Sequence, residues 1–226
     1  FPPLHTMSTF YRPMEQLGGD FFDFIRLPDS EEMGIFLSDV SGHGVTAAFI
    51  TSMIKTVLLQ AGDRLSDPAS LIQYMNDVLF NQTSGNFVTI FYGIYDPVER
   101  SLVYSSAGHN SPFLITADGV SEILVQPRIP VAVFSNGEMI ARNRSYSNTR
   151  LKLPSSGRLL FYTDGLLEAR STVGHDFFGE SALNKILLDS LHMPPTMFRD
   201  HLCHRLEQFH GSSSFEDDVC FISLDF

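Results

Sequence analysis

The sequence predicts an α+β fold, in which two antiparallel sheets are covered on their outer faces by helices. Two observations predict it. Short apolar strand patterns follow one another along the chain, and the helical patterns occur in successive pairs rather than one after each strand. Strands that follow each other directly favour antiparallel pairing, because a parallel pair needs a long crossover between its strands.

The strand patterns are bounded by turn residues. The turn at 28–32 predicts a hairpin, and Asp96-Pro97 and Asp118-Gly119 predict turns of a later meander. The expected strands lie at 9–13, 18–27, 33–40, 86–95, 101–107, 112–116, 120–125, 158–163 and 219–225. Residues 138–153 alternate less cleanly, and 211–215 form a loop before the last strand.

Four helices are expected. Apolar residues recur at helical spacing over 45–60. Asp67 followed by Pro68 marks the start of a second helix, which runs to about Asn81. The later pair lies at 180–189 and 195–209.

Length and charge restrict the kinds of protein considered. The 226 residues predict a single domain over 1–226, and a start at Phe1 rather than Met suggests a domain excised from a longer protein with an upstream sensor or linker. The net charge of −11 argues against nucleic acid or an anionic membrane as the main partner. No apolar stretch has the length of a membrane span, and no signal peptide pattern occurs.

Cysteine use indicates a reducing compartment. The chain has two cysteines, Cys203 and Cys220, without a CxxC pair. Two thiols rather than a disulfide, in a cytoplasmic protein, are therefore expected.

Four aspartates stand at strand ends beside glycine or a second acid. Asp39 lies in Ser38-Asp-Val-Ser-Gly-His-Gly44, and Asp164 closes the strand 158–163 before Gly165. Asp20 and Asp217 repeat the arrangement near either end of the chain. Such carboxylates repel one another unless a cation lies among them, and all-oxygen ligation suits Mg²⁺ or Mn²⁺. The pattern predicts a metal-dependent hydrolase, with a site for two ions.

Simpler interpretations compete with this one. Asp-Gly after a strand is a common turn, and Asp23 in a half-exposed strand is unremarkable. Residues 42–47 also match the G-x-G-x-x-A dinucleotide fingerprint. A dinucleotide site is disfavoured because the next element is a second helix rather than a parallel strand, and because Asp39 would repel a pyrophosphate.

Six segments in order strongly resemble bacterial metal-dependent protein phosphatases (PPM family) of the SpoIIE/RsbU type. They are Tyr11-Arg-Pro-Met-Glu-Gln-Leu-Gly-Gly-Asp-Phe-Phe-Asp23, Ser38-Asp-Val-Ser-Gly-His-Gly44, Phe87-Val-Thr-Ile-Phe-Tyr-Gly93, Ala107-Gly-His-Asn-Ser-Pro112, Tyr162-Thr-Asp-Gly-Leu-Leu-Glu168 and Asp217-Asp-Val219. The resemblance extends from about Thr9 to Phe226. It implies a four-layer α-β-β-α sandwich with a two-metal site at one edge of the sheets.

The resemblance also implies which residues bind the two divalent cations, Mn²⁺ or Mg²⁺. Asp39 would bridge both ions, and Asp164 and Asp217 would bind the first. The main-chain carbonyl of Val40 would join the second metal, with Asp20 completing that site through water. Asp218, which follows the last of these acids, is a further candidate ligand.

The implied reaction is hydrolysis of phosphoserine or phosphothreonine on a protein, by a water that the two metals activate. Asp39 and Asp20 would act in catalysis through the metals. His43 is a candidate general acid, but it lies four residues after Asp39, whereas the acid histidine proposed in the eukaryotic branch lies two residues after the bridging aspartate. A backbone hydrogen bond is an equal alternative for His43, and a structural role is favoured for His109.

Other features leave the function open. Where relatives commonly show Gly-x-Pro-Leu-Gly, this chain has Arg128-Ile-Pro-Val-Ala-Val133, and Arg128 or Arg142 could reach a substrate phosphate. Family analogy suggests a phosphorylated anti-sigma-factor antagonist as substrate. The alternatives are a non-catalytic pseudophosphatase that binds a phosphoprotein, and a hydrolase of small phosphorylated metabolites.

Overall fold

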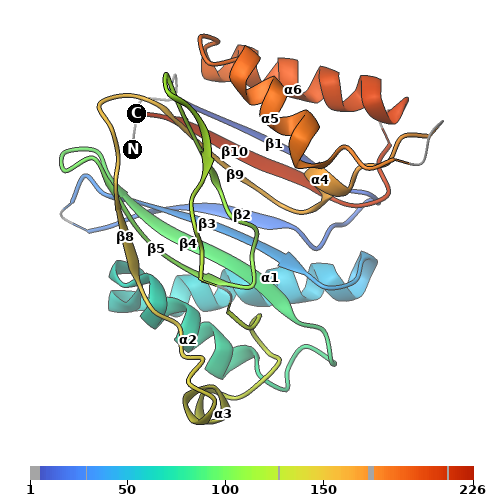
Figure 1. Cartoon of the computed structure of the whole chain (residues 1–226). Helices are drawn as coiled ribbons and strands as arrows, with labels where there is room; N and C mark the ends of the chain where they lie inside the picture. Colours follow the sequence, from blue (N-terminus) through green and yellow to red (C-terminus); the bar gives the residue numbers. More distant parts are fainter. Residues whose placement is uncertain (1–5, 29, 127, 173–175, 213) are drawn as a thin grey trace. The chain divides into compact units, whose positions relative to one another are not determined.

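The computed structural model describes residues 6–28, 30–126, 128–172, 176–212 and 214–226 (Figure 1). They group into two compact units. Unit 1 comprises Leu17–His109 and Val125–Leu153. Unit 2 comprises residues 6–16, Asn110–Leu124 and the described part of 154–226. Each unit contains one antiparallel five-stranded sheet and its own helices.

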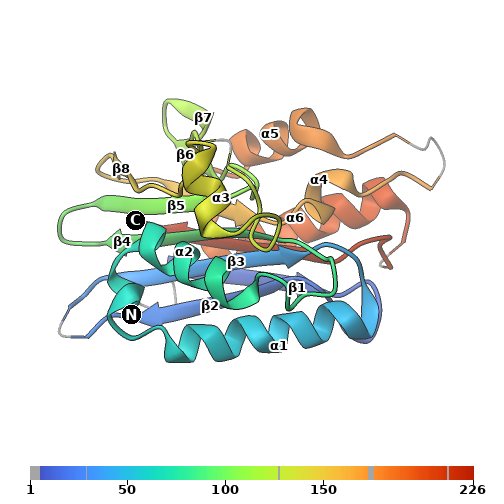
Figure 2. The ribbon, with the colours of Figure 1, turned by 90° about the horizontal axis from the view of Figure 1, so that it is seen from below.

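Unit 1 is built on the sheet β2-β3-β4-β5-β8, with α1 and α2 on one face (Figure 2). Its interior strand β3 is buried along nearly its whole length, as its apolar run predicts. The strands are β2 (Phe21–Arg26), β3 (Met33–Val40), β4 (Val88–Asp96), β5 (Ser101–Ala107) and β8 (Thr149–Lys152). The helices are α1 (Gly44–Gln60), the 3₁₀ helix η2 (Gly62–Ser66), α2 (Pro68–Leu79) and the short α3 (Asn136–Ala141).

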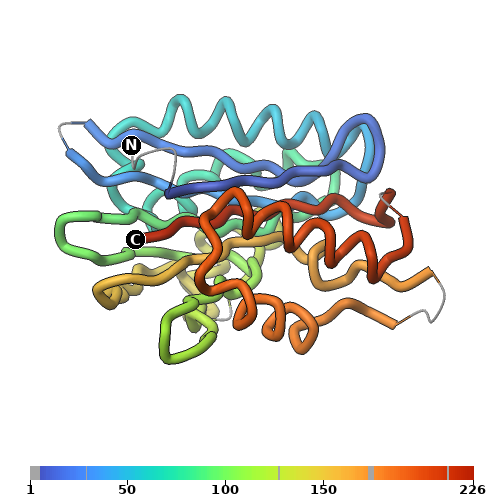
Figure 3. The backbone as a smooth tube through the Cα atoms, turned by 90° about the horizontal axis from the view of Figure 1, so that it is seen from above, coloured from blue at the N-terminus to red at the C-terminus, as the bar shows by residue number. Residues whose placement is uncertain are grey.

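Unit 2 is built on the sheet β1-β10-β9-β6-β7, and α5 and α6 pack against one face of it (Figure 3). The strands are β1 (Met7–Arg12), β6 (Phe113–Thr116), β7 (Gly119–Glu122), β9 (Arg158–Tyr162) and β10 (Val219–Asp225). The helices are α4 (Gly165–Glu168), α5 (Gly179–Asp189) and α6 (Pro195–His210). The strands β9 and β10 are central and almost fully buried.

Most of the predicted elements are confirmed. The α+β class, the two antiparallel sheets and the four long helices are present, and β2 and β3 form the expected hairpin. The start of α2 is as predicted: Asp67 Oδ1 accepts a hydrogen bond of 2.9 Å from the Ser70 amide, and Pro68 begins the helix. The turn at 28–32 and the loop at 211–215 include Asp29 and Ser213, which lie outside the described residues, as does Phe1.

Two predictions are corrected. The four strands over 86–125 are not one meander, because β4 and β5 pair in unit 1 whereas β6 and β7 belong to the other sheet. The chain leaves β5 at Gly108, where φ is +71° and an added Cβ would lie 2.8 Å from Pro130 Cγ. Residues 138–153 contain the end of α3, which a capping box of Ser135 and Glu138 starts, and then only the short strand β8.

Both cysteines are free thiols, as predicted, Cys220 buried and Cys203 half-buried. Among the described residues, no helix is both long and apolar enough to cross a membrane.

A buried ion pair connects the central strands of unit 2 to its helices. Arg158, 5% exposed, donates from Nε to Asp225 Oδ1 at 2.6 Å and from Nη2 to Asp225 Oδ2 at 2.9 Å. Its Nη2 also donates to the Met193 carbonyl at 2.6 Å, and the guanidinium lies 4.3 Å from the centre of the Phe198 ring. This arginine therefore fixes β9, β10 and the start of α6 in one arrangement.

Replacing Arg158 by Ala is expected to lower the free energy of unfolding by about 2 to 3 kcal/mol, because the Asp225 carboxylate and the Met193 carbonyl lose a buried donor. Urea denaturation measures the loss. Arg199→Ala is the matched control: Arg199 bonds its neighbour Asp200 at an exposed position, so its loss should cost less than about 1 kcal/mol. Equal effects of the two substitutions would contradict the structural role of Arg158.

Candidate metal centre

In unit 1 the β2–β3 hairpin brings Asp20, Asp39 and the Val40 carbonyl to one end. Asp39 is the second-last residue of β3, and Phe21, the first residue of β2, pairs with Ser38. Asp20 immediately precedes β2 and is 6% exposed. A Cβ on Gly19 would lie 2.9 Å from the Val40 carbonyl oxygen, so only glycine lets the chain pass this close. Two carboxylates and a carbonyl therefore share this end of the hairpin.

The turn after Asp39 is held by backbone contacts. The Ser41 amide donates to the Phe87 carbonyl at 2.9 Å, and the Phe87 amide donates to Ser41 Oγ at 2.9 Å. Gly42 and Gly44 adopt φ of +90° and +75°. His43, between them, is exposed at the start of α1, and its side chain does not cap that helix. The predicted general-acid role of His43 stays a prediction.

Asp23 and His109 have structural roles. Asp23 Oδ2 lies 2.5 Å from Lys55 Nζ, so it joins β2 to α1. His109 is 5% exposed, and its Nδ1 lies 2.8 Å from Thr89 Oγ1. Because Thr89 is the β4 partner of Asp39, His109 supports the strand beside the candidate ligand.

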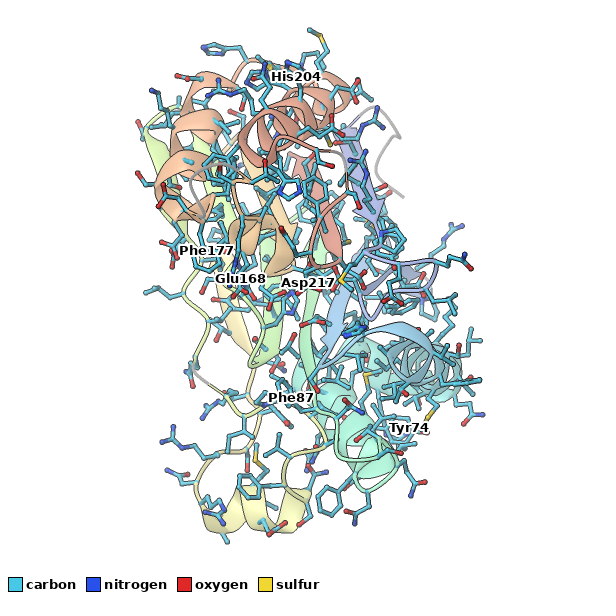
Figure 4. The ribbon with its side chains drawn as sticks, turned by 90° about the vertical axis from the view of Figure 1, so that its right-hand side faces the viewer. Tyr74, Phe87, Glu168, Phe177, His204 and Asp217 are labelled. Atoms are coloured by element: carbon cyan, nitrogen blue, oxygen red, sulfur yellow. The ribbon has the colours of Figure 1, made fainter. Side chains whose placement is uncertain are left out.

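In unit 2 the ends of β9 and β10 bring Asp164 and Asp217 together. The Thr163 amide donates to the Cys220 carbonyl at 3.0 Å, and the Cys220 amide donates to Thr163 Oγ1 at 3.1 Å. Asp164 follows Thr163, and Asp217 lies two residues before Val219, the first residue of β10. A Cβ on Gly165 would lie 2.0 Å from the Asp218 carbonyl oxygen, so the two backbones are in direct contact. Figure 4 shows Glu168 and Asp217 on these neighbouring segments.

Asp218 is a backbone anchor in this structure. It is 7% exposed, and its Oδ1 accepts a hydrogen bond of 2.7 Å from the Met14 amide. Its own amide donates to Asp217 Oδ1 at 2.7 Å, which fixes the orientation of that carboxylate. The prediction that Asp218 binds metal stays untested.

The carboxylates of unit 2 repel one another. Burial, followed by the nearby charges of Asp217 and Glu168, raises the pKa of Asp164 to about 6. Glu168 closes the Tyr162–Glu168 motif, but no role was expected for it from the sequence. Its position at the end of that motif, one helical turn after Asp164, was the available signal.

A cavity of about 520 Å³ adjoins this carboxylate group. Two segments line it, 165–172 and 215–217, and its polar side chains include Glu168, Arg170, Glu216 and Asp217. The two arginines considered from the sequence are engaged locally: Arg128 donates to Gln126 and Ser147, and Arg142 lies 4.4 Å from the centre of the Phe134 ring.

The donors suit a hard divalent cation, because every candidate ligand is a carboxylate or carbonyl oxygen. In each unit a glycine, Gly19 or Gly165, lets the backbone segments beside the candidate ligands pack closely. Within residues 6–28, 30–126, 128–172, 176–212 and 214–226, no group of three or more acidic, histidine or cysteine side chains that could hold a metal ion was found. Each unit described by itself thus supplies part of the predicted ligand set.

Comparison with known structures defines the class. The structure resembles the SiaA-PP2C domain of Pseudomonas aeruginosa with a TM-score of 0.82 at 21% sequence identity, covering 98% of this chain and 86% of that one. It resembles RsbX, crystallised in complex with magnesium, with a TM-score of 0.68 at 16% identity, covering 97% of this chain and 94% of that one. The fold is that of the PP2C phosphatases.

Sequence comparison gives the family. A model described as Stage II sporulation protein E (SpoIIE) matches residues 29–226, and the chain belongs to this family. It is 22% identical over 224 residues to phosphoserine phosphatase RsbP of Bacillus subtilis (strain 168), covering 97% of this chain and 52% of RsbP. It is 26% identical over 176 residues to phosphoserine phosphatase RsbU of the same organism, covering 77% of this chain and 50% of RsbU. The chain spans about half the length of these curated relatives.

Asp164→Asn is expected to stabilise the metal-free protein above pH 6. A folded-state pKa above the unfolded value favours the neutral acid, so the wild type loses stability as pH rises through about 6, and the amide avoids this loss. Urea denaturation in EDTA should show a gain of about 1 to 2 kcal/mol at pH 7.5 and little difference at pH 4. Asp118→Asn, in an exposed turn, should show no gain at either pH. A destabilised Asp164→Asn at pH 7.5 would contradict the raised pKa of Asp164.

Gly165→Ala is expected to lower the free energy of unfolding by about 3 kcal/mol or more, because the added methyl group meets a backbone oxygen that cannot turn away. Gly137→Ala is the control, since the nearest atom to its Cβ would be 4.0 Å away within α3, and a gain of about 0.5 kcal/mol is expected. Thermal and urea unfolding of both variants measure the difference. A Gly165→Ala protein as stable as wild type would show that the two backbones are not in contact.

Proposed function

We propose that residues 1–226 form a single metal-dependent protein serine/threonine phosphatase domain. The observation that carries the proposal is the carboxylate group of Asp164, Asp217 and Glu168, in which burial and like charge raise the pKa of Asp164. Such a group is costly for the protein alone and favourable for binding a cation. Membership of the SpoIIE family and the PP2C fold support the same activity.

The proposed metal ligands come from both units. Unit 1 would supply Asp39 to both ions, with the Val40 carbonyl and Asp20 at the second. Unit 2 would supply Asp164 and Asp217 to the first, and Asp218 is a further candidate. When bound, two Mn²⁺ or Mg²⁺ ions supply positive charge that stabilises the phosphoryl oxygens and lowers the pKa of water. A solved relative in complex with magnesium, RsbX, supports the choice of divalent cation.

The residues of this chain would position the reactants. Rigid strand ends and the close contacts at Gly19 and Gly165 hold the carboxylates in fixed places, so little reorganisation accompanies the reaction. His43, which is exposed and lies four residues after Asp39, is the proposed source of a proton for the leaving serine or threonine oxygen.

The proposed substrate is a bacterial regulatory protein phosphorylated on serine or threonine, such as an anti-sigma-factor antagonist. The names of RsbP and RsbU, both phosphoserine phosphatases, support the phosphoserine part of this proposal. An upstream sensor or linker segment in a longer chain would regulate the domain.

A second candidate is a non-catalytic module that binds a phosphoprotein. The observation that favours it is that, among the described residues, no group of three or more acidic, histidine or cysteine side chains is placed so that it could hold a metal ion. The two candidates differ in whether the purified chain turns over a phosphate ester.

Asp39→Asn is expected to abolish metal-dependent hydrolysis of p-nitrophenyl phosphate, a loss of at least about a hundredfold, and to weaken binding of both metals. Asp23→Asn is the matched control on the same hairpin, because Asp23 pairs with Lys55 and should leave turnover within about twofold of wild type. Assays contain Mn²⁺, Mg²⁺ or EDTA, and circular dichroism confirms that each variant is folded.

Wild-type turnover by a folded Asp39→Asn protein would refute the assignment of the site. If the wild type is inactive with every metal, calorimetric Mn²⁺ titration separates the candidates. Two filled sites favour a phosphatase domain that needs its regulator, and no binding favours the non-catalytic module.

A further inference from the structure

His210, the last residue of α6, is a buried histidine with two backbone acceptors. It is 2% exposed. Its Nδ1 lies 2.5 Å from the Arg170 carbonyl oxygen, and its Nε2 lies 2.7 Å from the Ser214 carbonyl oxygen. Carbonyl oxygens only accept hydrogen bonds, so both ring nitrogens face acceptors.

This geometry selects one form of the imidazole ring. A neutral imidazole has a single N–H and would leave one carbonyl oxygen against a nitrogen lone pair inside the protein. The doubly protonated ring donates to both oxygens. Its position at the C-terminus of α6 favours positive charge, because the helix dipole places negative charge there.

One carboxylate beside the ring favours a cation, whereas two arginines in the same region oppose it. Glu216 Oε2 lies 3.8 Å from Nδ1. The Arg170 guanidinium lies 4.7 Å from the centre of the Phe177 ring. The Arg12 guanidinium lies 5.5 Å from the centre of the Phe215 ring, which lies 5.1 Å from the centre of the imidazole. Arg12 is in turn paired with Glu207 at 2.6 Å.

The ring joins the two segments that carry Asp164 and Asp217. Arg170 follows Asp164 through α4, and Ser214 leads into Asp217. The carbonyl of His210 adds to this connection, because it accepts the Thr172 amide at 3.1 Å and Thr172 Oγ1 at 2.8 Å. The same two segments line the 520 Å³ cavity beside Asp217.

We propose that His210, protonated on both ring nitrogens, is a positioning residue that holds the Asp217 segment to the Asp164 segment. The proposal rests on the proposed phosphatase function, because it assigns the two segments to one metal centre. Like charges on Asp164 and Asp217 push the segments apart before metal binds, and a cross-link at the base of both segments opposes that movement. It therefore preorganises the ligands of unit 2 without contacting metal or substrate.

The ring state is measured on the wild-type chain, without any substitution. Nitrogen-15 spectra of the histidine rings at pH 7.0 should show both nitrogens of His210 protonated. The control is His204, an exposed residue of the same helix, whose ring signals are recorded in the same spectra (Figure 4). A neutral His210 ring at pH 7.0 would overturn the proposal.

His210→Gln tests the consequence, with His204→Gln as the matched control. A glutamine can donate to one of the two carbonyls but cannot span both, so amide hydrogen exchange over 169–172 and 214–218 should become at least about tenfold faster. Mn²⁺ affinity and kcat on p-nitrophenyl phosphate should each fall about tenfold with KM unchanged. His204→Gln should match the wild type in every measurement.

Two outcomes separate this proposal from the proposed function. Wild-type exchange, Mn²⁺ affinity and kcat in a folded His210→Gln protein would overturn the positioning role and leave the phosphatase intact. A wild-type chain that neither binds Mn²⁺ nor hydrolyses the ester would contradict the phosphatase, while the ring spectra and the hydrogen exchange still decide whether His210 joins the segments.

Discussion

The candidate site depends on one constraint: the backbone holds carboxylates close together although they repel one another. Asp164 and Asp217 stand at the ends of β9 and β10, whose register is fixed by the Thr163–Cys220 hydrogen bonds. Gly165 permits a backbone contact with Asp218 that leaves no room for a side chain. The strand ends therefore hold the two carboxylates close together, and burial, followed by the charges of Asp217 and Glu168, raises the pKa of Asp164. Such an arrangement is expected where a bound cation offsets the repulsion between the carboxylates.

The surrounding structure of each unit serves to keep these strand ends rigid. Arg158 joins β9 and β10 to the start of α6, and His210 connects the other end of α6 to the segments around Asp164 and Asp217. In unit 1, the Gly19–Val40 contact places Asp20 beside the end of β3. Buried polar residues outside the candidate metal centre thus help to fix the positions of its candidate ligands.

The sequence predicted the long elements because their apolar periodicity is local: α1, α2, α5, α6 and the central strands were all expected. It did not predict that β6 and β7 leave the sheet of β4 and β5, since strand pairing across the chain depends on which apolar faces meet. The candidate ligands were found from strand-end aspartates beside glycine. The roles of Arg158 and His210 depend on partners up to 67 residues away, which no local pattern records. For Glu168 a local signal existed, its place one helical turn after Asp164.

Anomalous diffraction from crystals grown with Mn²⁺ tests the central claim most directly. The account predicts two manganese peaks whose ligands include Asp39, Asp164 and Asp217. Peaks elsewhere on the chain, or none near these carboxylates in a preparation that hydrolyses p-nitrophenyl phosphate, would contradict it. In that case the repulsion at Asp164 would need another explanation, and the catalytic centre would have to be sought among other residues.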